Sequence, residues 1–242
     1  IEREIDIDAE SQLIASVLSK KVAAGSTHVV IDIPVGPTAK IRTAESAQAL
    51  AGRLLMVGTA LDLDVACLLT DGSQPVGRGI GPAPEARDVL SVLRRDFGAP
   101  QDLAERALAL AATLLETGGV AAPGTGSALA RAVLADGRAW AKFAAICEAQ
   151  GGLRDPPEAV QSHEVTPPAA GIVAAIDNRK LARLAKLAGA PGNLAAGLTL
   201  AVRVGDTVVK GQPLFRLHAG TAGEIAYALE YATVAPAITI AG

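Results

Sequence analysis

The sequence predicts an α/β fold, with a mostly parallel sheet flanked by helices in residues 1–150 and a small α+β C-terminal domain in residues 169–242. Two observations support this prediction. A segment with helical spacing leads into THVVIDI, Thr27–Ile33, whose β-branched and almost continuously apolar residues are typical of a parallel strand covered on both faces. Residues 151–168 contain GG and two PP pairs and indicate an exposed linker, after which the pattern changes to short strands around one helix.

The first predicted helix runs from Ala9 to Ala24, with Asp8 in the N-cap position and Gly25 in a left-handed C-cap. The strand Thr27–Ile33 comes next, and it is followed directly by the loop PVGPTAK, which ends at Lys40. Open α/β sheets bind ligands at the carboxyl ends of their parallel strands. A ligand site is therefore expected at this loop.

A second helix, strand and loop repeat this order. Thr43–Leu61 has a helical apolar stripe, and Val65–Thr70 is predicted to be the next buried strand. Asp71 then opens DGSQPVGRGIGP, a glycine-rich loop that lacks the G-x-x-x-x-G-K-[ST] pattern of a P-loop. Two interpretations of this loop stay open, a phosphate-binding segment or a structural turn, and the next helix is predicted to begin near Glu85.

The rest of the first domain is predicted to be helical, with one helix over residues 101–117 and shorter helices within residues 127–149. In the second domain the strands AGIVAAI and LTLAVRV flank the helix Arg179–Leu187, and a final helix and strand begin at Tyr227. The motif GD-x-V-x-x-G-x-PL between them is similar to half of a lipoyl-type hammerhead. Lys210 lacks the Met-Lys or Asp-Lys context of a carrier site, so covalent cofactor attachment is not expected.

Composition and charge exclude several classes of function. The formal net charge is −3 and aromatic residues make up 2% of the chain, which offers no basic surface or stacking platform for nucleic-acid polymers. No uncharged apolar stretch reaches the length of about 18 residues that a membrane-spanning helix needs.

Cys67 and Cys147 have no metal-like spacing, which indicates a reduced cytoplasmic protein without a disulfide. The scattered His28, His163 and His218 are expected to be structural.

A hydroxyl group and an ammonium group lie one turn apart on the first predicted helix. With about 100° between successive residues, Ser16 and Lys20 both border the Leu13 edge of the apolar arc. Either they are solvated residues, with Lys20 favoured by the helix dipole, or they face a ligand together. Lys21 falls inside the apolar arc near the helix end, so periodicity alone does not decide which lysine would face a ligand.

A resemblance to a known family is carried by SVLSKKVAAG, HVVIDIPVGPTAK, TDGSQPVGRGIGPAPEARDVL, AWAKFAAICEAQGG and GIVAAIDNRKLARLAKLAGAP. These segments resemble the thymidine (pyrimidine-nucleoside) phosphorylases over nearly the whole chain. IDIPVGP, with Pro34 and Pro37, is more similar to the nucleoside-monophosphate (archaeal AMP) phosphorylases and their bacterial thymidine-phosphorylase relatives. Family members are about twice as long, so the resemblance implies a C-terminal piece, with a helical domain and the phosphate-holding segment upstream.

The resemblance implies an activity and assigns residues to it. The activity is that of a pentosyltransferase, the reversible phosphorolysis of thymidine to base and 2-deoxyribose 1-phosphate, with inorganic phosphate as co-substrate and no cofactor or metal. Ser16, Lys20 and Lys40 are the implied substrate contacts, and Asp8 and Lys20 the implied catalytic residues, with Asp8 as a proton donor to the base. Negative charge develops on the departing base, where a fixed cation stabilises the transition state more than the substrate. The 242-residue chain alone is expected to be inactive.

Two other functions stay open. A nucleoside 5′-monophosphate phosphorylase, such as an AMP phosphorylase, would need a second cationic pocket, for which Lys40 is the candidate. A non-enzymatic ligand-binding or scaffold domain would have kept the fold after loss of the phosphate-binding half. The expected partners are a nucleoside or nucleotide and phosphate, with a homo-oligomer formed through the upstream part, and neither a nucleic-acid polymer nor a membrane.

Overall fold

A computed structural model describes residues 10–242, which form two compact units. The first unit comprises the described residues up to Asp71 together with Leu108–Arg131, and the second comprises Gly72–Ala107 together with Ala132–Gly242. Asp8, the predicted N-cap and proton donor, lies outside the described residues.

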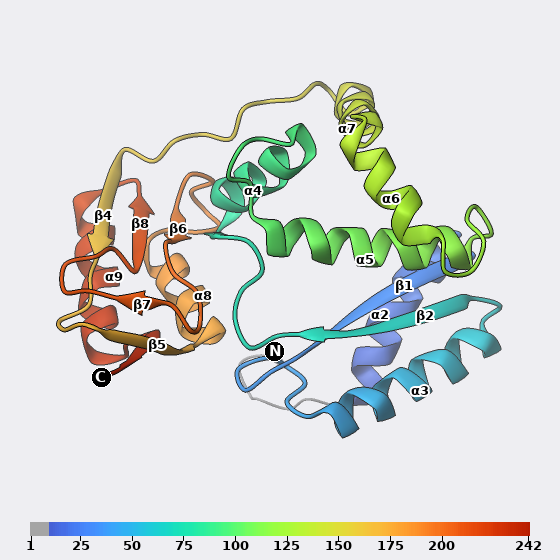
Figure 1. The fold of residues 1–242 in the computed structure, drawn as a ribbon, viewed down its shortest axis with the longest axis horizontal. Helices are drawn as coiled ribbons and strands as arrows, with labels where there is room; N and C mark the ends of the chain where they lie inside the picture. Colours follow the sequence, from blue (N-terminus) through green and yellow to red (C-terminus); the bar gives the residue numbers. More distant parts are fainter. Residues whose placement is uncertain (1–9) are drawn as a thin grey trace. The chain divides into compact units, whose positions relative to one another are not determined.

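The first unit is built on a parallel pair of strands. Its elements in chain order are α2 (Glu10–Ala23), β1 (His28–Val35), α3 (Ala44–Ala60) and β2 (Asp64–Asp71). β1 and β2 run parallel and side by side, with His28 opposite Asp64 and Val35 opposite Asp71 (Figure 1). The parallel sheet that the apolar strand patterns predicted is therefore confirmed, as a two-stranded sheet among the described residues.

The core of this unit lies between the strands and the helices that precede and follow β1. Its buried residues come from all four elements and from the turn before β2: Ile14, Leu18, Val29, Ile33, Ala47, Leu50, Leu54, Leu63 and Val65. Alternate residues of β1 point into this core because successive side chains of a strand point to opposite faces. α3 approaches β2 closely at Gly58, where a Cβ atom would lie 2.4 Å from Val65 Cγ2.

Helix ends in the first unit follow the sequence signals. Gly25 has a φ of +69°, the left-handed conformation of the predicted C-cap after α2. Ser26 N donates to Lys21 O at 3.0 Å and closes that last turn. Thr43 is the N-cap of α3, and its side chain accepts a hydrogen bond from Ser46 N at 3.2 Å. α2 and β1 are therefore joined by a short connection, Ala24–Thr27.

The second unit combines helices with two antiparallel sheets (Figure 1). One sheet has the order β3-β6-β8-β4 and the other the order β7-β5-β9. The strands are β3 (Gly79–Ile80), β4 (Gln161–Val165), β5 (Gly171–Ile176), β6 (Gly197–Leu200), β7 (Thr207–Val208), β8 (Phe215–Ala219) and β9 (Ile238–Ala241). Its helices are α4 (Pro82–Arg94), α7 (Arg138–Ala149), α8 (Asn178–Leu187) and α9 (Ala222–Val234). α5 (Gln101–Thr117) and α6 (Gly126–Ala135) each have residues in both units.

The larger of two clusters of buried apolar residues in the second unit lies between its strands and helices. Five of its residues have a relative exposure of 0%: Leu181 and Leu184 of α8, and Val173, Leu198 and Leu217 of the strands. α9 begins with a capping box in which Thr221 and Glu224 satisfy each other's backbone N–H groups. A small α+β domain after the parallel sheet is thus confirmed.

The predicted domain bounds stay a prediction. Two strands that lie outside the predicted C-terminal domain pair with strands inside it. β3 belongs to the predicted first domain by sequence, but it pairs with β6, with Gly79 opposite Thr199. β4 lies inside the predicted linker, residues 151–168, and pairs along its whole length with β8. α9 begins at Ala222, earlier than the predicted Tyr227, because its capping box lies upstream of the apolar stripe.

Candidate functional site

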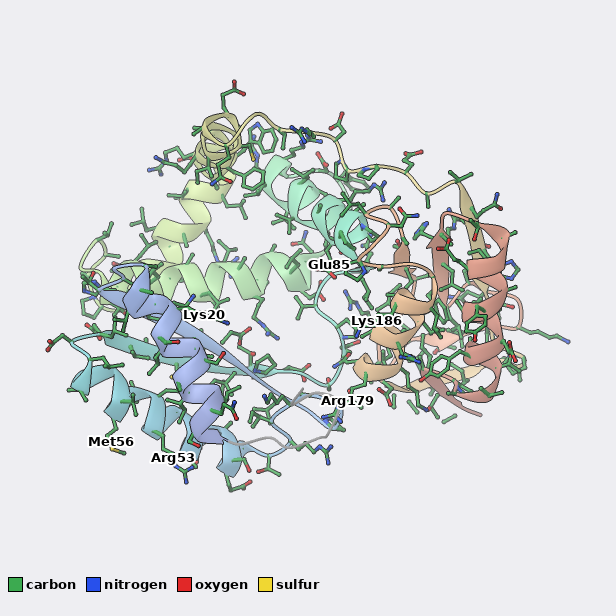
Figure 2. All side chains as sticks on the ribbon, turned by 180° about the vertical axis from the view of Figure 1, so that it is seen from behind. Lys20, Arg53, Met56, Glu85, Arg179 and Lys186 are labelled. Carbon is green, nitrogen blue, oxygen red and sulfur yellow. The ribbon has the colours of Figure 1, made fainter. Side chains whose placement is uncertain are left out.

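Ser16 and Lys20 lie on successive turns of α2 and are both exposed. Figure 2 labels Lys20 on this helix. Ile14 and Leu18 anchor the helix, with 7% and 1% of their surface exposed, while Leu13 and Val17 are half-buried. Ser16 and Lys20 follow the half-buried edge, as the periodicity predicted. Their hydroxyl and ammonium groups can therefore act on the same ligand from adjacent turns.

Lys21 is exposed as well, although the helical spacing places it inside the apolar arc. The reason is its position, because α2 ends at Ala23 and no further turn continues the buried face beyond Lys21. The structure therefore leaves both lysines accessible to a ligand. Their direction around the helix, and not burial, distinguishes them.

Lys40 is exposed in the loop after β1. This loop folds back on the strand: Gly36 N donates to Ile41 O at 3.1 Å, Ala39 N donates to Gly36 O at 3.1 Å, and Ile41 forms a parallel bridge with Val35. Lys40 is thus held close to the carboxyl end of β1, where a ligand site was expected.

The structure separates Lys20 from Lys40. A short connection joins α2 to β1, so the last turn of α2 lies near the amino end of β1, whereas Lys40 lies beyond its carboxyl end. β1 has 8 residues, and a strand of that length extends for about 25 Å. A single small group of a ligand could therefore not reach both the Ser16 and Lys20 pair and Lys40.

A polar pair that the sequence patterns did not single out joins the two parallel strands. Thr70 of β2 donates from Oγ1 to Oδ1 of Asp32 on β1, and both residues are partly buried. A carboxylate inside an almost wholly apolar strand was the signal that could have identified Asp32. The pair lies near the carboxyl ends of both strands, the edge where α/β sheets bind ligands.

The glycine-rich loop after β2, Gly72–Gly81, is here called the strap. Its backbone N–H groups are hydrogen-bonded to carboxylates of the second unit. Gly77 N donates to Asp102 Oδ2 at 3.0 Å, while Arg78 N and Gly79 N donate to Asp88 Oδ2 at 2.5 and 2.7 Å. Carboxylates thus take the positions that a bound phosphate would occupy in an anion-binding loop. The structure supports the structural turn, one of the two interpretations open from the sequence.

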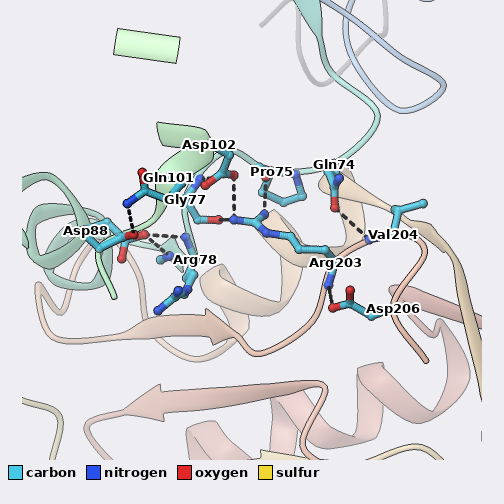
Figure 3. A network of polar contacts seen from close by, with 12 residues as sticks. Gln74, Pro75, Gly77, Arg78, Asp88, Gln101, Asp102, Arg203, Val204 and Asp206 are labelled. Atoms are coloured by element: carbon cyan, nitrogen blue, oxygen red, sulfur yellow. Dashed lines mark hydrogen bonds and ion pairs between the residues drawn. The ribbon is translucent and has the colours of Figure 1, made fainter. Parts of the chain in front are cut away.

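The strap carbonyls face a cation of the same unit (Figure 3). Arg203 donates from Nη1 to Pro75 O at 2.7 Å and from Nη2 to Gly77 O at 2.6 Å. Its Nη2 also lies 2.7 Å from Asp102 Oδ2. Val204 N donates to Gln74 Oε1 at 2.9 Å, which adds a further link between the strap and the segment after β6.

The remaining candidate groups have ordinary structural surroundings. Cys67 is partly buried on β2, and this burial raises the pKa of its thiol, which makes it a poor nucleophile. His218 Nε2 lies 2.9 Å from Thr199 Oγ1, and His28 Nδ1 lies 2.9 Å from Thr27 Oγ1. Lys210 is exposed in the turn after β7.

Within residues 10–242 no group of three or more His, Cys, Asp or Glu residues is arranged to hold a metal ion. The helices in that same range are all too short or too polar to cross a membrane.

Comparison with known proteins identifies relatives over almost the full length of the chain. Residues 172–239 match the family described as pyrimidine nucleoside phosphorylase C-terminal domain. The chain is 61% identical over 238 residues to "Putative thymidine phosphorylase 1" of Acidovorax sp. (strain JS42), covering 98% of this chain and 47% of the relative. It is 64% identical over 233 residues to "Putative thymidine phosphorylase" of Polaromonas sp. (strain JS666 / ATCC BAA-500), covering 96% of this chain and 45% of the relative.

A protein of Ralstonia nicotianae (strain ATCC BAA-1114 / GMI1000), also named "Putative thymidine phosphorylase", is 55% identical over 241 residues, covering 100% of this chain and 48% of the relative. The chain thus spans about half the length of the curated relatives it matches. The resemblance that its sequence motifs indicated is confirmed.

Proposed function

We propose, from the confirmed resemblance to the pyrimidine-nucleoside phosphorylases, that this chain forms part of an enzyme that phosphorolyses thymidine. The enzyme would transfer the 2-deoxyribosyl group reversibly between the pyrimidine base and inorganic phosphate. The observation that carries the proposal is the exposed pair on α2, Ser16 and Lys20, which occupies the positions that the resemblance links to the base.

The proposed chemistry places one positive charge where negative charge develops. An oxygen of phosphate attacks C1′ of the sugar, the bond from C1′ to the base nitrogen breaks, and its electron pair stays on the base. The Lys20 ammonium and the Ser16 hydroxyl donate to the base and stabilise this charge. Asp8 is proposed as the group that returns a proton to the base. These interactions strengthen as the bond breaks, so they lower the barrier and do not only hold the substrate.

Lys40 favours one alternative substrate class. Its exposed position close to the carboxyl end of β1, where open α/β sheets bind ligands, suits contact with a phosphoryl group. A nucleoside 5′-monophosphate has such a group and a nucleoside does not. An AMP-type phosphorylase is therefore the second candidate.

The test is base release by the full-length protein with phosphate and separate nucleosides and nucleotides. Lys20→Met keeps the aliphatic stem and removes the charge. We expect it to lower kcat and kcat/KM by about 10²–10³, the scale of losing one donor to a developing negative charge. Lys21→Met, the matched control from the next position, is expected to change both constants little.

Two outcomes would contradict the proposal. The first is a wild-type protein that releases no base from any nucleoside or nucleotide, which would leave the non-enzymatic alternative. The second is a Lys20→Met variant that raises KM alone, which would mean binding without transition-state stabilisation by Lys20. Turnover by the 242-residue chain alone at the full-length rate would contradict a separate expectation, that this chain alone is inactive because the resemblance places the phosphate-holding residues upstream.

A further inference from the structure

We propose that Arg203 is a positioning residue that locks the strap, the segment directly after β2, in one conformation. The lock itself follows from contacts within the second unit. Only its expected effect on turnover rests on the proposed function.

Arg203 contacts the strap through two donors of its side chain. A guanidinium group presents N–H donors in a rigid planar fork, which can reach several acceptors at once. Nη1 and Nη2 of Arg203 take the carbonyls of Pro75 and Gly77, on either side of Val76. A hydrogen bond to a carbonyl oxygen restricts the rotation of its peptide plane. These two bonds therefore fix the direction of the backbone around Val76.

The contacts among Arg203, Asp102 and Gly77 form a closed ring. Arg203 lies 2.7 Å from Asp102 Oδ2, and that same oxygen accepts from Gly77 N at 3.0 Å. Gly77 is therefore held through its N–H group by Asp102 and through its carbonyl by Arg203. The side chains of Arg203 and Asp102 are only 27% and 40% exposed, so solvent screens this ion pair less than a fully exposed one.

The backbone of Arg203 is itself held in place by Asp206. Its backbone N donates to Asp206 Oδ2 at 2.7 Å, and Asp206 N donates back to Arg203 O at 3.1 Å. At the start of the strap, Asn178 Nδ2 donates to Gly72 O at 3.0 Å. The strap is thus anchored from its first residue by the segments around β5 and β6, and Arg203 makes two of its side-chain bonds.

The place of the strap in the chain, directly after β2, links its conformation to turnover. Gly72 follows Asp71, the last residue of β2, and Thr70 beside it holds the Asp32 carboxylate. Parallel strands of α/β sheets present ligand-binding groups at this end. A strap with several conformations would leave the residues directly after β2 without a fixed backbone path, and misplacement of about 1 Å in a reacting group can cost a large part of the rate.

The experiment compares Arg203→Gln and Arg203→Lys with Arg216→Gln. Arg216 is the matched control because it also forms an ion pair in the same unit, with Glu164 on the neighbouring strand, and does not contact the strap. Amide hydrogen exchange of residues 72–81 is measured in the 242-residue chain. Base release is measured for the same variants in the full-length protein.

We expect Arg203→Gln to speed exchange of the strap amides by about tenfold or more relative to wild type, because several bonds to a charged group are lost. Arg203→Lys should not restore slow exchange, since a single ammonium cannot span both carbonyls and Asp102. In the full-length protein both variants should lower kcat/KM by about tenfold, with unchanged exchange in β6 and β8. Arg216→Gln should leave strap exchange and kcat/KM within about twofold of wild type.

The lock is refuted if Arg203→Gln leaves exchange of residues 72–81 unchanged, or if Arg203→Lys restores it fully, which would reduce the role to net charge. The positioning role is refuted if the strap exchanges faster while kcat/KM equals that of Arg216→Gln. A wild-type protein without base release would overturn the proposed function and the turnover effect, while the exchange data would still decide the lock.

Discussion

The two loops that leave the parallel strands share a sequence signature and differ in structure. Each follows a buried strand, and each contains glycine and proline. In the loop after β1, Gly36 N and Ala39 N donate to carbonyls of the same loop, and Lys40 is exposed. The strap after β2 has its N–H groups bonded to Asp88 and Asp102 and its carbonyls bonded to Arg203.

This difference shows that a glycine-rich loop after a strand is not by itself evidence of a ligand site. Backbone N–H groups that converge on one point need an anion, and an internal carboxylate can supply it as well as a phosphate can. The strap uses its convergent groups for folding. The loop after β1 instead holds an exposed cation, Lys40, close to the carboxyl end of its strand.

The strongest test of this comparison is the removal of the Lys40 charge in the full-length protein. Lys40→Met should lower kcat/KM for a nucleoside 5′-monophosphate by about tenfold to a hundredfold, the scale of a charge-assisted hydrogen bond to a phosphoryl group. Nucleoside turnover should change much less. Phosphate-dependent base release with both substrates measures the difference.

Arg42→Met is the control for Lys40→Met, since Arg42 is an exposed cation two residues further along the same loop. It is expected to leave both substrates unaffected. Equal losses of nucleotide and nucleoside turnover in Lys40→Met would place Lys40 at another part of the ligand and favour the thymidine reaction over the AMP-type one.

The strap can be tested from the opposite side by removing its internal anion. Asp88→Ala leaves Arg78 N and Gly79 N without the carboxylate that they share. Losing bonds to a charged group should lower the free energy of unfolding by about 2–3 kcal/mol, measured by urea denaturation. Asp155→Ala, at an exposed aspartate of the predicted linker, should change stability by less than about 0.5 kcal/mol.

Inorganic phosphate sharpens the Asp88 experiment. If the emptied N–H groups can hold an anion, phosphate should raise the unfolding midpoint of Asp88→Ala more than that of the wild type. An Asp88→Ala protein as stable as the wild type would break the comparison, because the strap would then not depend on its carboxylates.

The smallest expected effect concerns the pH dependence of the sheet that the strap joins through β3. Burial, and then the nearby charges of Arg87 and Arg216, lower the pKa of His218 from its ordinary value of 6.5. The folded state therefore favours neutral His218, while the unfolded chain takes up a proton near the ordinary value. The stabilisation is complete above that value and is lost as pH falls through the lowered folded pKa.

We accordingly expect the free energy of unfolding to decrease as pH falls below about 6.5, and His218→Gln to make this decrease shallower. His163→Gln, which replaces an exposed histidine on the neighbouring strand β4, is the comparison variant. A wild-type slope that His218→Gln does not alter would assign the pH dependence to other groups.

Long periodic elements could be predicted from the sequence, because their apolar spacing reflects packing within a few turns. α5 was predicted over its observed range, Gln101–Thr117, and the parallel strands to within two residues. β4 was missed because four of its five residues are exposed and polar side chains dominate it, so it has no apolar alternation. β3 has 2 residues, too few for any period.

The site shows the same limit. The adjacent positions of Ser16 and Lys20 follow from one helical turn, and the structure keeps both exposed. The state of the strap depended on Arg203, 126 residues from Gly77 along the chain. Pairings over such separations are decided by how the units fold, and no local pattern in the sequence announces them. The separation of Lys20 from Lys40 likewise required the direction of α2 relative to β1.

The edge strands of the β3-β6-β8-β4 sheet bear on how this protein can be divided for expression. The family match covers residues 172–239, which contain β6 and β8 but neither β3 nor β4. A fragment cut at those limits would uncover both long edges of the remaining strand pair at once. Open edges recruit other strands, so such a fragment would tend to aggregate even though its own core is complete. A soluble fragment would have to begin before Gln161 and would still need a substitute for Gly79–Ile80.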